Sequence, residues 1–136
     1  MMVDLLDSRV RVLFADLQHA GCHPSAVGLP TVEGVAGREA RGTRVRFALT
    51  IDGPRVAEAR YQAYGCPHTL AACEWLCRRL EAHEAPGSLG GASDWCQALG
   101  IPIVKLGRLL VVEDALRAAL DRVRGSATFA AENVVK

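Results

Sequence analysis

The feature that most constrains the fold of this chain is a pair of alternating segments joined by a tight turn. Between residues 44 and 51, apolar side chains occupy every second position, with arginine or small residues between them. That alternation is typical of a strand with one buried face. Residues 57–63 repeat the alternation, and the intervening Asp52-Gly53-Pro54 is a turn sequence in which glycine can adopt a positive φ. The sequence therefore predicts an antiparallel β-hairpin.

Helical periodicity flanks this hairpin on both sides. Apolar residues spaced by three and four predict four helices, over residues 3–20, 66–80, 93–99 and 109–124. Proline directly after Cys66 favours the start of the second helix, because proline is preferred at the first helical position. Ser93 is a predicted cap of the third helix, and Gly125 is the predicted end of the fourth.

The remaining segments are predicted to be irregular. Residues 21–42 predict a loop with at most a short strand near residues 31–35, and residues 101–105 predict an extended segment. The tail, residues 126–136, has no clear partner. The sequence therefore predicts one α+β domain over residues 1–136, with a small antiparallel sheet of two to three strands and helices packed on one face.

Composition narrows the functional classes. The 136 residues are 50% hydrophobic and carry a formal net charge of +1, which argues against a disordered chain and gives no electrostatic footprint for nucleic acid. No run of eighteen apolar residues predicts a membrane span. Asp4 and Asp7 interrupt the apolar N-terminal stretch, unlike a secretory signal. We therefore expect a cytoplasmic protein.

The cysteines are more typical of free thiols or ligands than of disulfides, because the chain shows no export signal. There are five, with no C-x-x-C motif: Cys22, Cys66, Cys73, Cys77 and Cys96. Cys73 and Cys77 share the apolar stripe of the second predicted helix, so we interpret both as core residues rather than metal ligands. Cys96 has the same interpretation.

Cys66 differs, because a thiol at a helix N-terminus feels the positive end of the helix dipole, which favours the thiolate. His68 lies in the first turn of the same helix and is a candidate metal ligand beside Cys66; the alternative is a solvated histidine. The loop pair Cys22-His23 would complete a zinc site if the fold brings it to them. His19 and His83 are interpreted as surface residues.

Three stretches, taken together, resemble one known family. They are Tyr64-Gly65-Cys66 at the start of a helix, Ile101-Pro102-Ile103-Val104-Lys105, and the helical run from Val111 to Ala119, VVEDALRAA. Their order and spacing resemble the IscU/NifU N-terminal family of iron–sulfur cluster scaffold proteins. The resemblance covers residues 34–124 as a family-like core, and the predicted N-terminal helix fits the same layout.

The resemblance implies a ligand set that this chain keeps only in part. Family members hold iron through three cysteine thiolates, assisted by an aspartate and a histidine. In this chain Arg41 stands at the first cysteine position and Thr43 at the aspartate, whereas Cys66 is the retained second cysteine. Gly107-Arg108 stands where the family has His-Cys. An arginine does not ligate iron, so the resemblance implies a degenerate member of the family.

Three functional hypotheses follow. The first is a non-enzymatic protein of iron–sulfur cluster assembly that docks the family's partners, a cysteine desulfurase and a chaperone, without holding an iron–sulfur cluster or iron in the usual way; the resemblance assigns chaperone docking to residues 101–105. The second is a thiol protein in which Cys66 accepts sulfur or senses oxidants, activated by Arg41 and Arg108. The alternative is that Arg41 and Arg108 are surface residues with no role in thiol chemistry. The third is a zinc-binding module built on Cys66 and His68.

Overall fold

The computed structural model describes residues 6–21, 28–82 and 86–135 of the chain. Its elements follow the order α1 (Ser8–Phe14), β1 (Thr31–Arg38), the 3₁₀ turn η2 (Glu39–Arg41), β2 (Thr43–Asp52), β3 (Arg55–Tyr64), α2 (Pro67–Glu81), η3 (Pro86–Ser88), α3 (Ala92–Leu99), η4 (Ile103–Lys105) and α4 (Leu106–Val135). Within these residues no helix is both long enough and apolar enough to cross a membrane.

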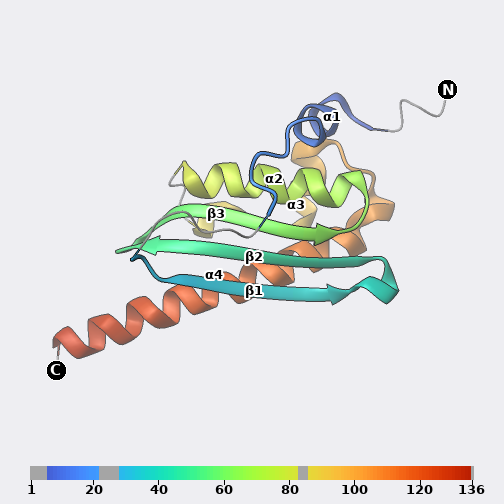
Figure 1. Cartoon of the computed structure of the whole chain (residues 1–136). Coiled ribbons are helices and arrows are strands. Elements are labelled where there is room, and N and C mark those ends of the chain that lie inside the picture. Colours follow the sequence, from blue (N-terminus) through green and yellow to red (C-terminus); the bar gives the residue numbers. More distant parts are fainter. Residues whose placement is uncertain (1–5, 22–27, 83–85, 136) are drawn as a thin grey trace.

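The sheet has three antiparallel strands in the order β1-β2-β3 (Figure 1). The predicted hairpin is confirmed as β2 and β3, which pair from Arg44 with Tyr64 to Asp52 with Arg55. The loop prediction for residues 21–42 is wrong in part, since β1 runs along β2 for eight residues. Gly34 and Gly37 hide the alternation of β1 in the sequence, because they place no side chain on either face.

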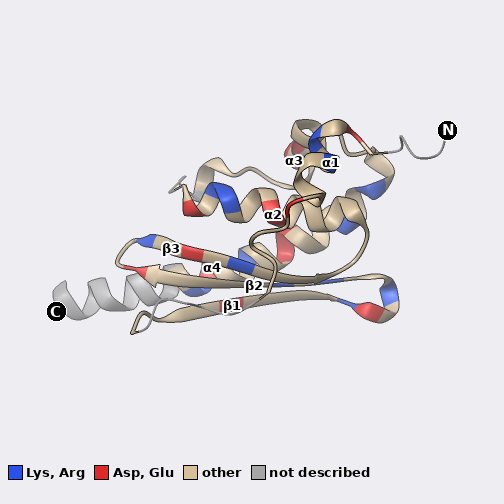
Figure 2. Ribbon diagram, turned by 45° about the horizontal axis from the view of Figure 1, so that its top comes forward, with Lys and Arg blue, Asp and Glu red and all other residues tan. Residues whose placement is uncertain are grey.

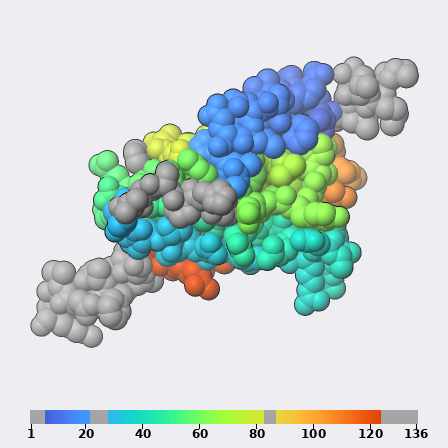
Figure 3. All heavy atoms as spheres, viewed as in Figure 1, coloured from blue at the N-terminus to red at the C-terminus, as the bar shows by residue number. Residues whose placement is uncertain are grey.

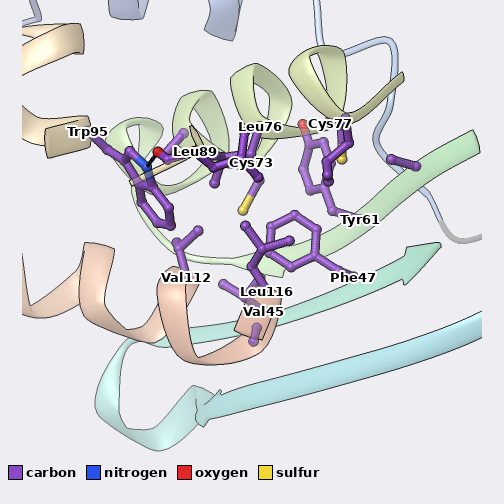
Figure 4. Packing of buried hydrophobic residues seen from close by; sticks show 14 of the residues in the cluster. Val45, Phe47, Tyr61, Cys73, Leu76, Cys77, Leu89, Trp95, Val112 and Leu116 are labelled. Atoms are coloured by element: carbon purple, nitrogen blue, oxygen red, sulfur yellow. Dashed lines mark hydrogen bonds between the residues drawn. The ribbon is translucent and has the colours of Figure 1, made fainter. Parts of the chain in front are cut away.

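Helices α2 and α4 pack on the same face of this sheet, and the α+β prediction is confirmed. Helix α2 contacts β3 and α4 contacts β1 and β2, while α2 and α4 contact each other. The core fills the space between these two helices and the strands, with side chains contributed from every layer (Figure 4): Val45, Phe47, Tyr61, Cys73, Leu76, Cys77, Val112 and Leu116 are all buried. Helix α1 lies over α2, seen as the blue segment above the green one in Figure 3.

Several predicted boundaries move in the structure. The first helix, predicted over residues 3–20, covers only Ser8–Phe14 in the described residues, because the Asp7 carboxylate caps the Arg9 amide at 2.8 Å. Helix α4 continues through Gly125 to Val135, so the predicted stop there is wrong; a single helical glycine costs only about 1 kcal/mol. Helix α3 is capped at Gly91 rather than at Ser93.

The segment after α1 is extended because it pairs with the free edge of β3. The Gly21 amide donates to the Tyr61 carbonyl at 2.6 Å, and the Tyr61 amide donates to the His19 carbonyl at 3.1 Å. A helix through residue 20 is incompatible with these bonds. The segment thereby covers the backbone of β3, which would otherwise be an open sheet edge.

His19 is buried in a charged network, so its interpretation as a surface residue is wrong. Its Nδ1 lies 2.6 Å from Oε2 of Glu74 and its Nε2 lies 2.8 Å from Oε1 of Glu81. The Arg78 Nε donates to the Glu74 carboxylate at 2.7 Å. Burial would raise the pKa of Glu74, but the hydrogen bonds from Arg78 and His19 outweigh it and hold that pKa below its usual value. The network therefore ties the segment after α1 to α2.

Strand β1 and helix α4 approach closely at Gly34, whose position is buried. A Cβ at Gly34 would fall on the carbonyl oxygen of Ala115 and the amide nitrogen of Ala119. Both are backbone atoms of α4, so neither can move aside as a side chain would. The absence of a side chain at Gly34 therefore allows α4 to lie directly on β1.

We expect Gly34→Ala to lower the free energy of unfolding by about 1–3 kcal/mol, since overpacking a tight contact forces the helix and strand apart. Urea denaturation followed by circular dichroism measures this change. Gly107→Ala is the matched control, because a Cβ there meets no atom within 4 Å; it should leave stability unchanged or raise it by up to about 1 kcal/mol. A Gly34→Ala protein as stable as wild type would contradict the close packing.

Candidate functional site

Cys66 stands where strand β3 passes into helix α2. It is the N-cap residue of α2 and is extended, with φ −85° and ψ 170°, and Pro67 follows as the first helical residue. Its Sγ lies 3.6 Å from the Thr69 hydroxyl and 3.9 Å from Nδ1 of His68. The thiol is half-buried and sits beside the unpaired amides of the first helical turn, which are the groups that stabilise an anion.

Several donors surround the Cys66 sulfur and change its acidity. Burial by itself would raise the pKa of the thiol, because a low-dielectric environment disfavours the thiolate. The Thr69 amide and hydroxyl, the His68 amide and the Arg108 side chain all donate toward the sulfur, and together they bring the pKa below its ordinary value. Thr69 contributes most to this lowering and Arg108 least, and Arg108 belongs to α4, an element distant in sequence.

His68 is buried rather than solvated, with 6% of its surface exposed. Its Nε2 is buried and has no hydrogen-bond partner among the residues described. Burial, together with the charges of Lys105 and Arg108, lowers the pKa of this histidine, so the ring is neutral at pH 7. The structure thus places His68 and Arg108 beside Cys66, with Lys105 near His68, and the solvated alternative for His68 is wrong.

A broad open pocket of about 670 Å³ lies at the end of the sheet where β1, η2 and α4 meet. Arg38, Arg41 and Arg108 line it, one from each of these elements, and Thr43, Val104 and Asp114 also contribute. The charged residues of η2 appear in Figure 2 as the blue and red bands at the far end of β1 and β2. Arg41 and Arg108 therefore share one pocket, and Arg108 reaches from it to Cys66.

The segment from Ile101 to Lys105 is only partly extended. Ile101 is buried in the core at 5% exposure, whereas Ile103 to Lys105 form the 3₁₀ turn η4, closed by the Lys105 amide donating to the Pro102 carbonyl at 2.9 Å. Ile103 and Val104 are 68% and 82% exposed. Two large apolar side chains thus protrude beside the pocket, a feature that favours a protein contact.

The donor set does not fit an iron–sulfur cluster. Among the described residues no three His, Cys, Asp or Glu side chains gather to hold a metal ion, and the Cys22-His23 pair lies outside them. Guanidinium groups stand at two of the positions that the resemblance assigns to thiolates, and one of them, Arg108, helps to lower the pKa of the remaining thiol. Burial raises the pKa of Cys73, Cys77 and Cys96, so these thiols stay protonated within the core.

Two residues of the site escape sequence reasoning. Thr69 donates to Cys66 from the first turn of α2, and its i+3 spacing from Cys66 is the signal that would have found it. Arg38 lines the pocket from the end of β1. The sequence predicts a loop for this segment, and a loop prediction does not give the direction of the Arg38 side chain.

Comparisons with known proteins agree with this architecture. The NifU-like N terminal domain family matches residues 7–128 of the chain. The "Bifunctional protein NifU/MnmA" of Rubrobacter xylanophilus is 39% identical over 79 residues, which are 57% of this chain and 16% of that much longer protein. The crystal structure of the N-terminal part of a nitrogen-fixing NifU-like protein from Brucella abortus aligns with a TM-score of 0.60 at 14% identity, covering 92% of this chain and 99% of that one.

The chain therefore belongs to the NifU-like N-terminal domain family, a family of iron–sulfur cluster assembly scaffolds. The structural likeness to the Brucella protein confirms the fold. The resemblance seen in the three sequence stretches is confirmed with it.

Proposed function

We propose that this domain serves iron–sulfur cluster assembly as a partner-docking member of its family, without an enzymatic reaction of its own and without holding a cluster through three thiolates. The observation that carries the proposal is the composition of the site: one polarised thiol, Cys66, and guanidinium groups in a pocket lined by Arg41 and Arg108. Two cationic groups beside a single thiolate supply neither the number of ligands nor the electron donors that iron requires.

The docking part of the proposal rests on the exposed turn η4. Its side chains Ile103 and Val104 protrude while Ile101 anchors the segment in the core, so the apolar surface is presented on a fixed base. We propose a chaperone as the partner of residues 101–105 and a cysteine desulfurase as the partner that reaches Cys66. We propose that both partners bind in the cytoplasm, a compartment where a thiol such as that of Cys66 stays reduced.

Reconstitution tests this proposal. We expect wild-type protein, incubated anaerobically with ferrous iron and sulfide and then desalted, to retain no stable visible chromophore and well under one iron per chain. The physical reason is the guanidinium groups at two ligand positions. The variant with Arg41→Cys, Thr43→Asp and Arg108→Cys restores the family's donors and should retain coloured iron.

A stable chromophore with near-stoichiometric iron in the wild type would contradict the proposal. Failure of the folded triple variant to retain iron would show that the assignment of Arg41 and Arg108 to ligand positions is wrong. Circular dichroism of both proteins establishes that they are folded. Cys66→Ser is the control that separates binding at this site from binding at the other thiols.

A second function, sulfur acceptance at Cys66, is favoured by the hydrogen bonds that stabilise its thiolate. The thiolate would attack the terminal sulfur of a donor persulfide, R–S–SH. A bond then forms between Cys66 Sγ and that sulfur, the sulfur–sulfur bond of the donor breaks, and R–S⁻ leaves with the electron pair. Because the attacking species is the thiolate, Thr69 and Arg108 promote the step by lowering the pKa of the Cys66 thiol.

Incubation of the Cys22→Ser protein with glutathione persulfide tests this function. We expect the peptide containing Cys66 to gain the mass of one sulfur atom, and Arg108→Gln to slow that gain several-fold because less thiolate is present. Arg55→Gln, at the opposite end of the hairpin, is the matched control and should react like wild type. No gain at Cys66, or an equal gain at the buried Cys73 and Cys77, would exclude sulfur acceptance at this site.

A further inference from the structure

The pocket lined by Arg38, Arg41 and Arg108 carries a net positive charge, since its lining holds three arginines and one carboxylate, Asp114. Neither Arg38 nor Arg41 forms an ion pair or a side-chain hydrogen bond with another described residue, and Arg108 donates only toward the neighbouring thiol. Five of the other described arginines have carboxylate partners within 4.0 Å: Arg9, Arg46, Arg60, Arg78 and Arg117. The arginine pocket thus brings together three described arginines that have no carboxylate partner.

Hydrogen-bonding groups inside the pocket are available as well. Thr43 lines it and is 5% exposed, and its hydroxyl makes no hydrogen bond with a described residue. Gly107 has no side chain, and a Cβ there would meet nothing within 4 Å, so the first turn of α4 leaves the pocket open. The adjacent Glu39 lines a separate depression with Arg44 and Tyr64 and is not among the lining residues of the arginine pocket.

The size and charges of the pocket select a class of ligand. A volume of about 670 Å³ accommodates a small organic molecule rather than a single ion. Guanidinium forks match the paired oxygens of phosphate, and arginine is the side chain favoured for such recognition. Asp114 lines the same pocket six residues after Arg108, about 9 Å further along α4. A ligand that fits both ends carries a phosphate group at one end and hydroxyl donors at the other.

We propose that the arginine pocket binds a small phosphorylated molecule, with its phosphate on Arg38, Arg41 and Arg108 and its hydroxyl groups toward Asp114. This site is independent of the proposed assembly function, because it needs neither iron nor a protein partner. It is also coupled to Cys66, since Arg108 contributes to both. A bound phosphate draws the Arg108 charge away from the sulfur, and the thiol becomes less reactive.

Calorimetric titration at physiological ionic strength tests the site, with ribose 5-phosphate, pyrophosphate and ribose as probes. We expect one ribose 5-phosphate per chain and no binding of ribose. Arg38→Gln and Arg41→Gln should each weaken ribose 5-phosphate binding by about ten-fold or more, because each removes a charge-assisted hydrogen bond. Arg41→Lys should weaken it less, since the charge remains while the fork is lost. Arg55→Gln, an exposed arginine outside the pocket, is the matched control.

Asp114→Asn separates the two ends of the ligand. It should strengthen the binding of pyrophosphate, because a like charge is removed. The affinity for ribose 5-phosphate should increase less, because the hydroxyl groups of this ligand lose an ionised acceptor. Saturating ribose 5-phosphate should also slow alkylation of Cys66 in wild type and leave it unchanged in Arg41→Gln at the same ligand concentration.

Three results would overturn the proposal. They are no binding of either phosphate probe at millimolar concentration, equal weakening by Arg55→Gln and Arg41→Gln, and binding only to a polyanion such as RNA. Arg38 and Arg41 are exposed, so these variants should fold, and thermal unfolding verifies it. Reconstitution with iron tests the assembly function separately. The phosphate-binding proposal can therefore fail while the assembly proposal stands, and the reverse also holds.

Discussion

The contact between strand β1 and helix α4 at Gly34 is the constraint on which the site depends. Gly34 pairs with Phe47 on β2 and lies against the backbone of Ala115 and Ala119 on α4. With α4 held at this distance, the end of β1 and the start of α4 stand on either side of the same depression. Arg38 and Arg108 therefore face a common pocket although 70 residues separate them in the chain. The placement of Arg38 and Arg108 at one pocket thus depends on the absence of a side chain at Gly34.

The fold also separates the thiols by their surroundings. Cys73 and Cys77 pack among the apolar residues of the core, where burial raises the pKa of each thiol. Cys66 lies at the start of the same helix, where amides, a hydroxyl and a guanidinium group face its sulfur. One helix therefore holds inert thiols along its buried face and a polarised thiol at its N-terminus. Among the described cysteines, Cys66 is the one whose pKa is lowered rather than raised.

Much of the fold could be predicted from periodicity, since the hairpin and the α2 stripe are local patterns. Strand β1 could not, because glycines replace the side chains that would show its alternation. The extended segment around His19 could not either: its bonds to Tyr61, Glu74 and Glu81 join residues distant in sequence. For the site, Cys66-Pro67 marks a helix start locally, whereas the contact of Arg108 with Cys66 spans two elements. No local pattern joins Arg41 and Arg108, so only the family resemblance predicts that they share a site.

The first turn of α2 and Arg108 lower the pKa of the Cys66 thiol at the place where the family resemblance implies a metal ligand. The direct measurement is the pH dependence of the alkylation rate of Cys66, followed by mass spectrometry in the Cys22→Ser protein. The account predicts an apparent pKa below the ordinary thiol value of about 8.5, which rises in Arg108→Gln and stays unchanged in Arg55→Gln. An ordinary or raised pKa in the parent protein, or no rise in Arg108→Gln, would contradict it.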